Sequence, residues 1–146
     1  MSDADERPAG DRSAEAPARP KPEPVGIPPP DGLLLVLTTV ATAEQAAAIA
    51  RTLVEERLAA CVNQLPGCRS VYRWQGAIEE ADETVLLIKT TRARHAALQK
   101  RLLALHPYEL PELVTVTPDA VLPAYAAWVV AQTRRSLVRP DGGSSA

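Results

Sequence analysis

One short segment concentrates side chains that could bind a metal ion. His106, Glu109 and Glu112 fall within seven residues, and Pro107 and Pro111 lie between them. Imidazole suits copper and zinc, and carboxylates complete a mixed nitrogen and oxygen site. Proline restricts the backbone, so these side chains would be held in place. Alternatively, the three residues have a structural role, which is the more common one for such short motifs. His106 and Glu109 would then hold the loop by hydrogen bonds, and Glu112 would pair with a cation across an interface.

A second group of residues could line a ligand cleft. Tyr72 and Trp74 are two residues apart on a predicted strand, so their rings face the same way. Such a pair could stack on a ligand, but it more often anchors a contact between subunits, because Trp and Tyr dominate interface cores. Lys89, at the end of another predicted strand, could bind an anionic ligand or pair with Glu79 or Glu83 across a hairpin.

The cysteines, histidines and serine of the predicted domain form no recognisable catalytic or zinc pattern. Cys61 and Cys68 are seven residues apart and His95 and His106 eleven, which is not the spacing of a structural zinc site. Ser70 lies in no Gly-x-Ser-x-Gly elbow, and there is no glycine-rich phosphate loop. The sequence therefore indicates a protein that is not an enzyme.

Apolar patterning predicts the elements that must position these residues. The run Leu33–Leu37 is too short for a buried helix and reads as a central strand. Thr42 and Gln45 fit a capping box at the start of a helix. Gly67 and Gly76 stand where the chain must bend. We expect strands at 33–37, 61–74, 84–90 and 113–117, and helices at about 43–54, 93–105 and 122–130.

The order of these elements predicts an α+β fold. The first six, βαββαβ, match the split βαβ or ferredoxin-like plan, and a C-terminal helix follows. Right-handed connections then place both main helices on one face of an antiparallel sheet. The strands at 33–37 and 85–88 are apolar on both faces, however. We therefore expect the uncovered sheet faces to meet at a subunit interface.

Composition divides the chain into one domain and two tails. Eight of the 14 prolines precede Leu33, whereas all five aromatic residues follow it. Residues 1–32 therefore lack the apolar surface to offset their ordering entropy, and we expect a disordered, proline-rich tail. Residues 33–133 suffice for one folded domain. The Gly- and Ser-rich segment 134–146 is expected to be flexible.

Charge and hydropathy argue against several partners. The net charge is −2 and no segment holds a block of basic residues, so nucleic acid is not expected to bind. No apolar run approaches the ~20 residues of a membrane span. The acidic start, Met1–Glu6, is unlike an export signal, so we expect a cytoplasmic protein with reduced thiols.

Five short segments carry a wider resemblance. They are residues 58–63 (LAACVN), 70–79 (SVYRWQGAIE), 89–91 (KTT), 106–112 (HPYELPE) and 125–128 (YAAW). In this order and spacing they resemble the CutA divalent-cation-tolerance family, over essentially all of the predicted domain. The resemblance implies a ferredoxin-like subunit in a tight homotrimer, in agreement with the burial argument.

The resemblance also implies a function. Members of this family bind copper and other divalent cations and are associated with metal tolerance. Their fold also resembles PII signalling proteins, so the alternative is a small-ligand sensor or interaction scaffold, with an inter-subunit cleft around Lys89, Tyr72 and Glu112. Some bacterial members have cysteine where this chain has Thr38 and a second histidine where it has Leu105. Without these soft ligands, we expect copper or another divalent cation to bind weakly.

Overall fold

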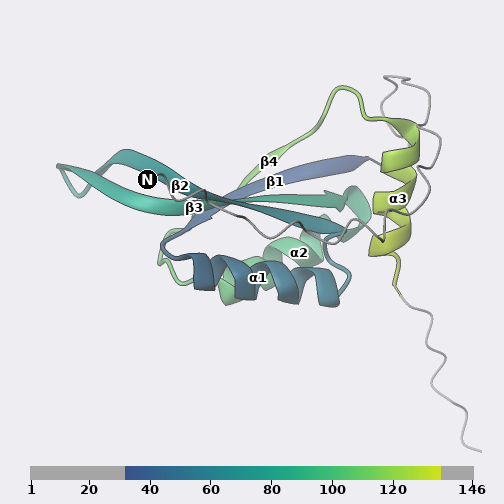
Figure 1. Ribbon diagram of the computed structural model, residues 1–146, viewed down its shortest axis with the longest axis horizontal. Helices are drawn as coiled ribbons and strands as arrows, with labels where there is room; N and C mark the ends of the chain where they lie inside the picture. The colour runs from purple at the N-terminus through teal and green to yellow at the C-terminus, as the bar shows by residue number, and fades with distance from the viewer. Residues whose placement is uncertain (1–31, 136–146) are drawn as a thin grey trace, which may run out of the picture.

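The predicted order of strands and helices is confirmed. The computed structural model describes residues 32–135, so the predictions for residues 1–31 and 136–146 lie outside the described part (Figure 1). Within it, no helix combines the length and the apolar character needed to cross a membrane. The elements are β1 Leu33–Val40, α1 Ala43–Glu55, β2 Cys61–Trp74, β3 Ala77–Thr91, α2 Arg92–Leu105, β4 Val114–Val116 and α3 Pro123–Thr133.

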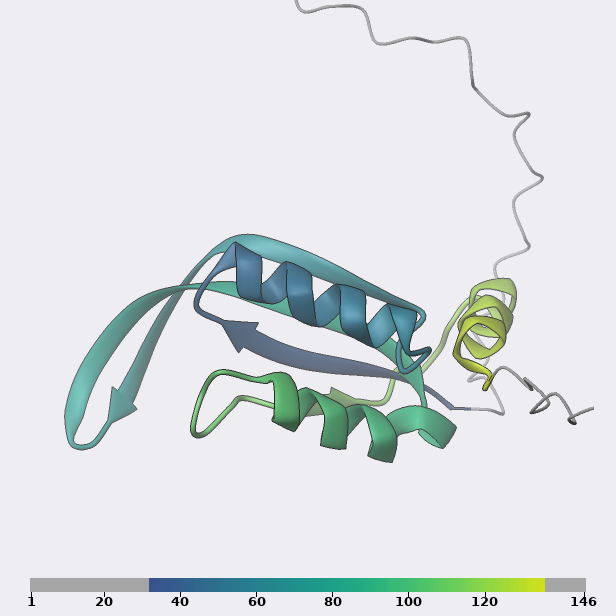
Figure 2. The same ribbon diagram turned by 90° about the horizontal axis from the view of Figure 1, so that it is seen from below.

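The four strands form one antiparallel sheet in the order β2-β3-β1-β4. β3 begins at Ala77, earlier than the predicted Thr84, and pairs with β2 between Ala77 and Lys89. The missed part is acidic and exposed, and it forms an arm that projects beyond the helices (Figures 1 and 2). An arm solvated on both faces needs no apolar alternation, so the hydrophobic pattern did not reveal it.

Two irregularities shape this arm, and both stand where the sequence placed bends. Gln75 and Gly76 connect β2 to β3 with positive φ angles of 48° and 80°. Positive φ at both central residues is the mark of a type I′ hairpin turn. The register between the strands shifts between Leu65 and Cys68, around Gly67. These features set which side chains of β2 face the rest of the molecule.

Helices α1 and α2 cover one face of the sheet (Figure 2). The core between them and the sheet contains Leu53, Leu86, Leu98 and Leu102, all fully buried. The predicted helix stripe places the buried residues of α1 correctly, except for Val54, which is exposed. Val54 lies at the margin of the stripe, where the helix turns away from the sheet.

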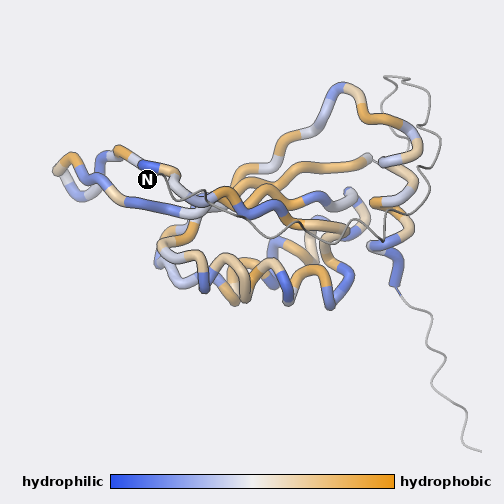
Figure 3. Tube along the Cα trace, viewed as in Figure 1, coloured by the Kyte–Doolittle hydropathy of each residue, from blue (hydrophilic) through white to orange (hydrophobic). Residues whose placement is uncertain are grey.

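The opposite face of the sheet is only partly covered. α3 stands at one end of it, where Val129 packs on Leu33 (Figure 1). Leu35, at the margin of this cluster, and Leu37 and Leu87, beyond it, are half-buried. Figure 3 shows β1 as hydrophobic along most of its length, whereas the arm alternates with hydrophilic segments. A single chain therefore leaves apolar sheet surface open to solvent.

Candidate functional site

A hollow of about 600 Å³ lies where the β2–β3 arm leaves the body of the molecule. We call it the arm-base pocket. It is bounded by β2, by the end of β1, by the middle of β3, and by the loop that joins α2 to β4. Tyr72, Trp74, Glu109 and Glu112 all line it. The structure thus brings together residues that the sequence analysis had assigned to two separate sites, a metal site and a ligand cleft.

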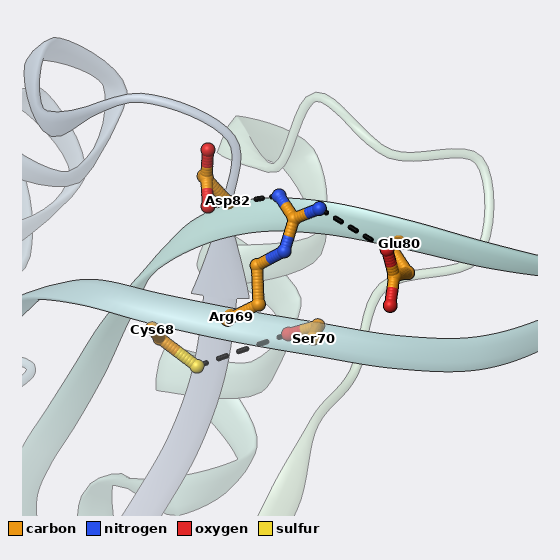
Figure 4. Close-up of polar contacts among 5 residues, drawn as sticks. All are labelled: Cys68, Arg69, Ser70, Glu80 and Asp82. Carbon is orange, nitrogen blue, oxygen red and sulfur yellow. Dashed lines mark hydrogen bonds and ion pairs between the residues drawn. The ribbon is translucent and has the colours of Figure 1, made fainter.

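The alternation of β2 decides which side chains reach the pocket. Ser70, Tyr72 and Trp74 share one face of the strand and line the hollow. Arg69 lies on the other face, where its guanidinium donates to Asp82 at 3.1 Å and to Glu80 at 3.2 Å (Figure 4). The strand therefore turns its aromatic and hydroxyl groups toward the pocket and this basic group away from it.

His106 anchors the loop to the end of β1. The residue is 8% exposed, and its Nδ1 accepts a hydrogen bond from the backbone N–H of Tyr108 at 3.1 Å. Nε2 therefore carries the proton and points to the Thr39 carbonyl and the Thr38 hydroxyl, each 3.0 Å away. Burial lowers the pKa of His106 below 6.5, although the Thr39 carbonyl and the charge of Glu83 oppose that shift. His106 thus has the structural role that the sequence analysis set beside the metal role.

Glu83 and Tyr108 join the arm to the loop. The Tyr108 hydroxyl donates to Glu83 Oε2 at 2.8 Å, across 25 residues of sequence. Burial by itself raises the pKa of Glu83, but hydroxyl donors at Ser70 and Tyr108 and the charge of His106 hold it below its usual value. Burial and this carboxylate raise the pKa of Tyr108. The pair is therefore a neutral phenol bound to an ionised carboxylate near pH 7.

Negative charge dominates the arm-base pocket. Glu112 accepts a hydrogen bond from the Thr39 hydroxyl at 3.2 Å, and Glu109 is exposed. Together with Glu83, these side chains supply three carboxylates. In the described part of the chain, no Lys, Arg or His side chain lines the hollow. Its electrostatic character favours a cation over an anion.

The predicted metal ligands do not form a complete site in one chain. Within residues 32–135, no three His, Cys, Asp or Glu side chains gather closely enough to hold a metal ion. Both ring nitrogens of His106 are already hydrogen-bonded. Glu109 and Glu112 remain as oxygen donors, the ligands that hard cations prefer. A metal site at His106, Glu109 and Glu112 stays a prediction, and one that needs further donors.

Lys89 does not join Tyr72 and Trp74 in this chain. It lies near the far end of β3, where it pairs with Leu35 of β1 and Cys61 of β2. A cleft that contains all three predicted residues would require a second subunit, and it also stays a prediction. Among the residues that the structure describes, no basic side chain opposes the carboxylates of the arm-base pocket.

The sequence analysis did not assign Glu83 or Tyr108 to a site. A signal for Glu83 was available, because counting back from the Gln75–Gly76 turn pairs Tyr72 with Glu79 and then, in the same register and before the bulge, Cys68 with Glu83. That register places Glu83 on the same face as Tyr72. No comparable signal existed for Tyr108, whose position depends on the path of an irregular loop.

Comparison with known proteins identifies relatives of the whole described domain. Residues 34–132 match the model of a protein family described as CutA1 divalent ion tolerance protein. A relative from Thermus thermophilus, named divalent-cation tolerance protein CutA, is 54% identical over 82 residues, which are 56% of this chain and 80% of the relative.

Solved structures share the fold. CutA from Xylella fastidiosa is 47% identical, with a TM-score of 0.69 over 70% of this chain and 99% of that one. CutA from Synechococcus elongatus, solved as a complex with a Bis-Tris molecule, is 42% identical, with a TM-score of 0.65 over 70% of this chain and 94% of that one.

Proposed function

The chain belongs to the CutA1 divalent ion tolerance family, and from that membership we propose that it binds divalent cations weakly and contributes to metal tolerance or homeostasis. Copper is the first candidate among these cations. The observation that carries the proposal is the arm-base pocket, which Glu83, Glu109 and Glu112 make acidic. The names of its relatives describe cation tolerance, not a chemical reaction, in keeping with a binding function.

Weak binding follows from the donors that the pocket offers. Carboxylate oxygens are hard ligands, and Thr38, which is fully buried and does not line the pocket, provides no thiolate for copper. Glu112 is exposed and Glu83 already accepts a hydrogen bond. A cation held here keeps much of its water shell, so we expect it to exchange readily.

We also propose that the protein is a cytoplasmic homotrimer of ferredoxin-like subunits. The strand order β2-β3-β1-β4, with α1 and α2 on one face, supports the ferredoxin-like plan. The half-buried Leu35, Leu37 and Leu87 on the other face support association, because water would otherwise contact that apolar surface. The arm-base pocket borders this open face, so a neighbouring subunit could supply the missing donors.

A small-ligand sensor is the second candidate. Tyr72 and Trp74 line the same pocket, and a divalent cation makes no use of aromatic walls. The Synechococcus elongatus relative complexed with Bis-Tris supports a capacity for small organic molecules. An anionic ligand of the PII type is less favoured, because Lys89 lies outside this pocket and the charged groups that line the pocket are carboxylates.

Copper(II) titration of the purified full-length protein against a competing chelator tests the proposal. We expect saturable binding near neutral pH, weakened about tenfold or more by Glu109→Gln or Glu112→Gln, because even outer partners of metal sites contribute roughly that much. Glu44→Gln, an equally conservative change at an exposed position on α1, is the matched control. Absence of binding at micromolar copper, or equal loss in the control, would contradict the site.

A further inference from the structure

The arm-base pocket combines two features that a metal ion alone does not require. Three carboxylates set its charge, and the rings of Tyr72, Trp74 and Tyr108 contribute aromatic surface. The face of an aromatic ring carries partial negative charge and attracts cations, most strongly in Trp. Carboxylates and aromatic faces therefore both attract positive charge. A ligand that contacts both kinds of group is an organic cation.

The rings of β2 are available for such contacts. Tyr72 is 43% exposed and Trp74 is 41% exposed, and they stand two residues apart on one face of the strand. Neither side chain has a hydrogen-bond partner within the described residues. Within a single chain, their faces and edges can thus receive a ligand without breaking an existing interaction.

The third ring is held in place. The Tyr108 hydroxyl is bound to Glu83, and its ring meets that of His106 edge-on with centroids 4.9 Å apart. Because His106 is itself bonded to β1, the position of Tyr108 is set by three elements of the fold. A preorganised ring loses little entropy when a ligand binds.

Size and charge define the ligand class. A hollow of about 600 Å³ lies within the range of small-molecule pockets and far exceeds a bare metal ion. The basic side chains of β2, Arg69 and Arg73, lie on the other face of the strand, and Arg69 is neutralised by Glu80 and Asp82. A ligand with a diffuse positive charge and methyl groups would contact rings and carboxylates together.

We propose that the arm-base pocket binds small organic ammonium ions, of the tertiary or quaternary type. The inference rests on the proposed role of this pocket as a cation site, and it adds the ligand class that the aromatic residues select. The carboxylates of Glu109 and Glu112 attract the charge, and Trp74 and Tyr72 contact the alkyl groups around it.

The test is a titration of the metal-free, full-length protein with choline at low ionic strength, followed by calorimetry. The neutral isostere 3,3-dimethylbutan-1-ol, which has the same shape without the charge, is the control ligand. We expect saturable choline binding and at least about tenfold weaker binding of the isostere. Equal affinity for the two ligands, or no saturable binding at millimolar choline, would overturn the proposal.

Matched variants separate the rings from the charge. Trp74→Leu should weaken choline binding at least about threefold. Trp128→Leu is the control, because Trp128 is 42% exposed on α3, at the opposite end of the sheet (Figure 1). Equal losses in the two variants would overturn the assignment to the arm-base pocket.

A carboxylate variant keeps the proposal testable if Trp74→Leu alters assembly. Glu109→Gln changes an exposed side chain and should weaken choline binding at least about threefold. Unchanged choline affinity in this variant would also contradict the assignment. Copper binding without choline binding would reject only the ammonium ligand, whereas choline binding without copper binding would reject only the metal function.

Discussion

His106 connects three parts of the molecule through one imidazole ring. It follows α2 directly, bonds β1 through Nε2 and receives the Tyr108 N–H at Nδ1. This arrangement needs the neutral ring, because a second proton would remove the acceptor at Nδ1. At the residue scale, the loop of the arm-base pocket therefore depends on the protonation state of His106.

We predict that acid weakens the fold through His106. Its folded-state pKa lies below 6.5, so the unfolded chain binds the proton more readily. The stabilisation is complete above pH 6.5 and is lost as pH falls through the folded-state pKa. In chelator-treated protein, we expect the melting temperature to fall as the pH is lowered below 6.5, and His106→Gln to flatten that slope.

The control for this prediction is His95→Gln. His95 Nε2 contacts the Thr115 hydroxyl at 2.7 Å, on the surface between α2 and β4. Glu83 has a folded-state pKa below 4.5, so the stability that it contributes is lost only in more acidic solution. It therefore does not affect the melting temperature in the pH range where His106 takes up its proton. If the melting temperature of His106→Gln depended on pH as steeply as that of the wild type, another group would be responsible.

At the element scale, the start of α1 has one polar side chain that forms its hydrogen bond and a nearby one that does not. Thr42 Oγ1 accepts from the Gln45 N–H at 3.1 Å, which completes half of the predicted capping box. The other half is not formed: within residues 32–135, Gln45 Oε1 is buried without a hydrogen-bond partner. The cap therefore depends on Thr42 alone.

Two substitutions at this helix start should differ in effect. Thr42→Ala should lower the free energy of unfolding by about 1 kcal/mol, the usual value of an N-cap side chain. Gln45→Met should leave it unchanged or raise it slightly, because it removes a buried, unpaired oxygen. Urea unfolding at one fixed protein concentration measures both. Comparable losses in the two variants would mean that the full capping box forms in solution.

At the scale of the whole molecule, the sheet has one covered face and one open face. Paired residues share a face, so Leu37 lies beside Leu87 and Val114 on the open side. The helix-side residues of the same strands, such as Val36 and Ile88, are fully buried. This difference is the physical basis of the proposed trimer, in which the open faces would cover one another.

A charge placed on the open face should dissociate the assembly. Leu87→Glu would put a carboxylate at the centre of the proposed interface, where burial of an unpaired charge is costly. We expect sedimentation equilibrium at micromolar concentration to give a trimer mass for the wild type and a monomer mass for this variant. Leu103→Glu, at a leucine that is 49% exposed on α2, should remain trimeric. A monomeric wild type would contradict the proposal.

The sequence by itself determined the order of elements, the bends of the arm and the side-by-side placement of Tyr72 and Trp74. These follow from local rules, since strand alternation and turn residues act over a few positions. The same rules placed the buried face of α1, with Val54 as the exception. The start of β3 was missed, because the charges of the solvated arm conceal its strand pattern.

Only the tertiary structure decided what the candidate site contains. The contact of Tyr108 with Glu83 spans 25 residues and depends on both hairpin register and loop path. Likewise, the hydrogen bonds that occupy both nitrogens of His106 come from distant backbone and cannot be read from its neighbours in sequence. Lys89 was separated from the pocket by its distance along β3. Chemistry that needs several side chains at one point depends on packing between elements, which residue spacing alone does not specify.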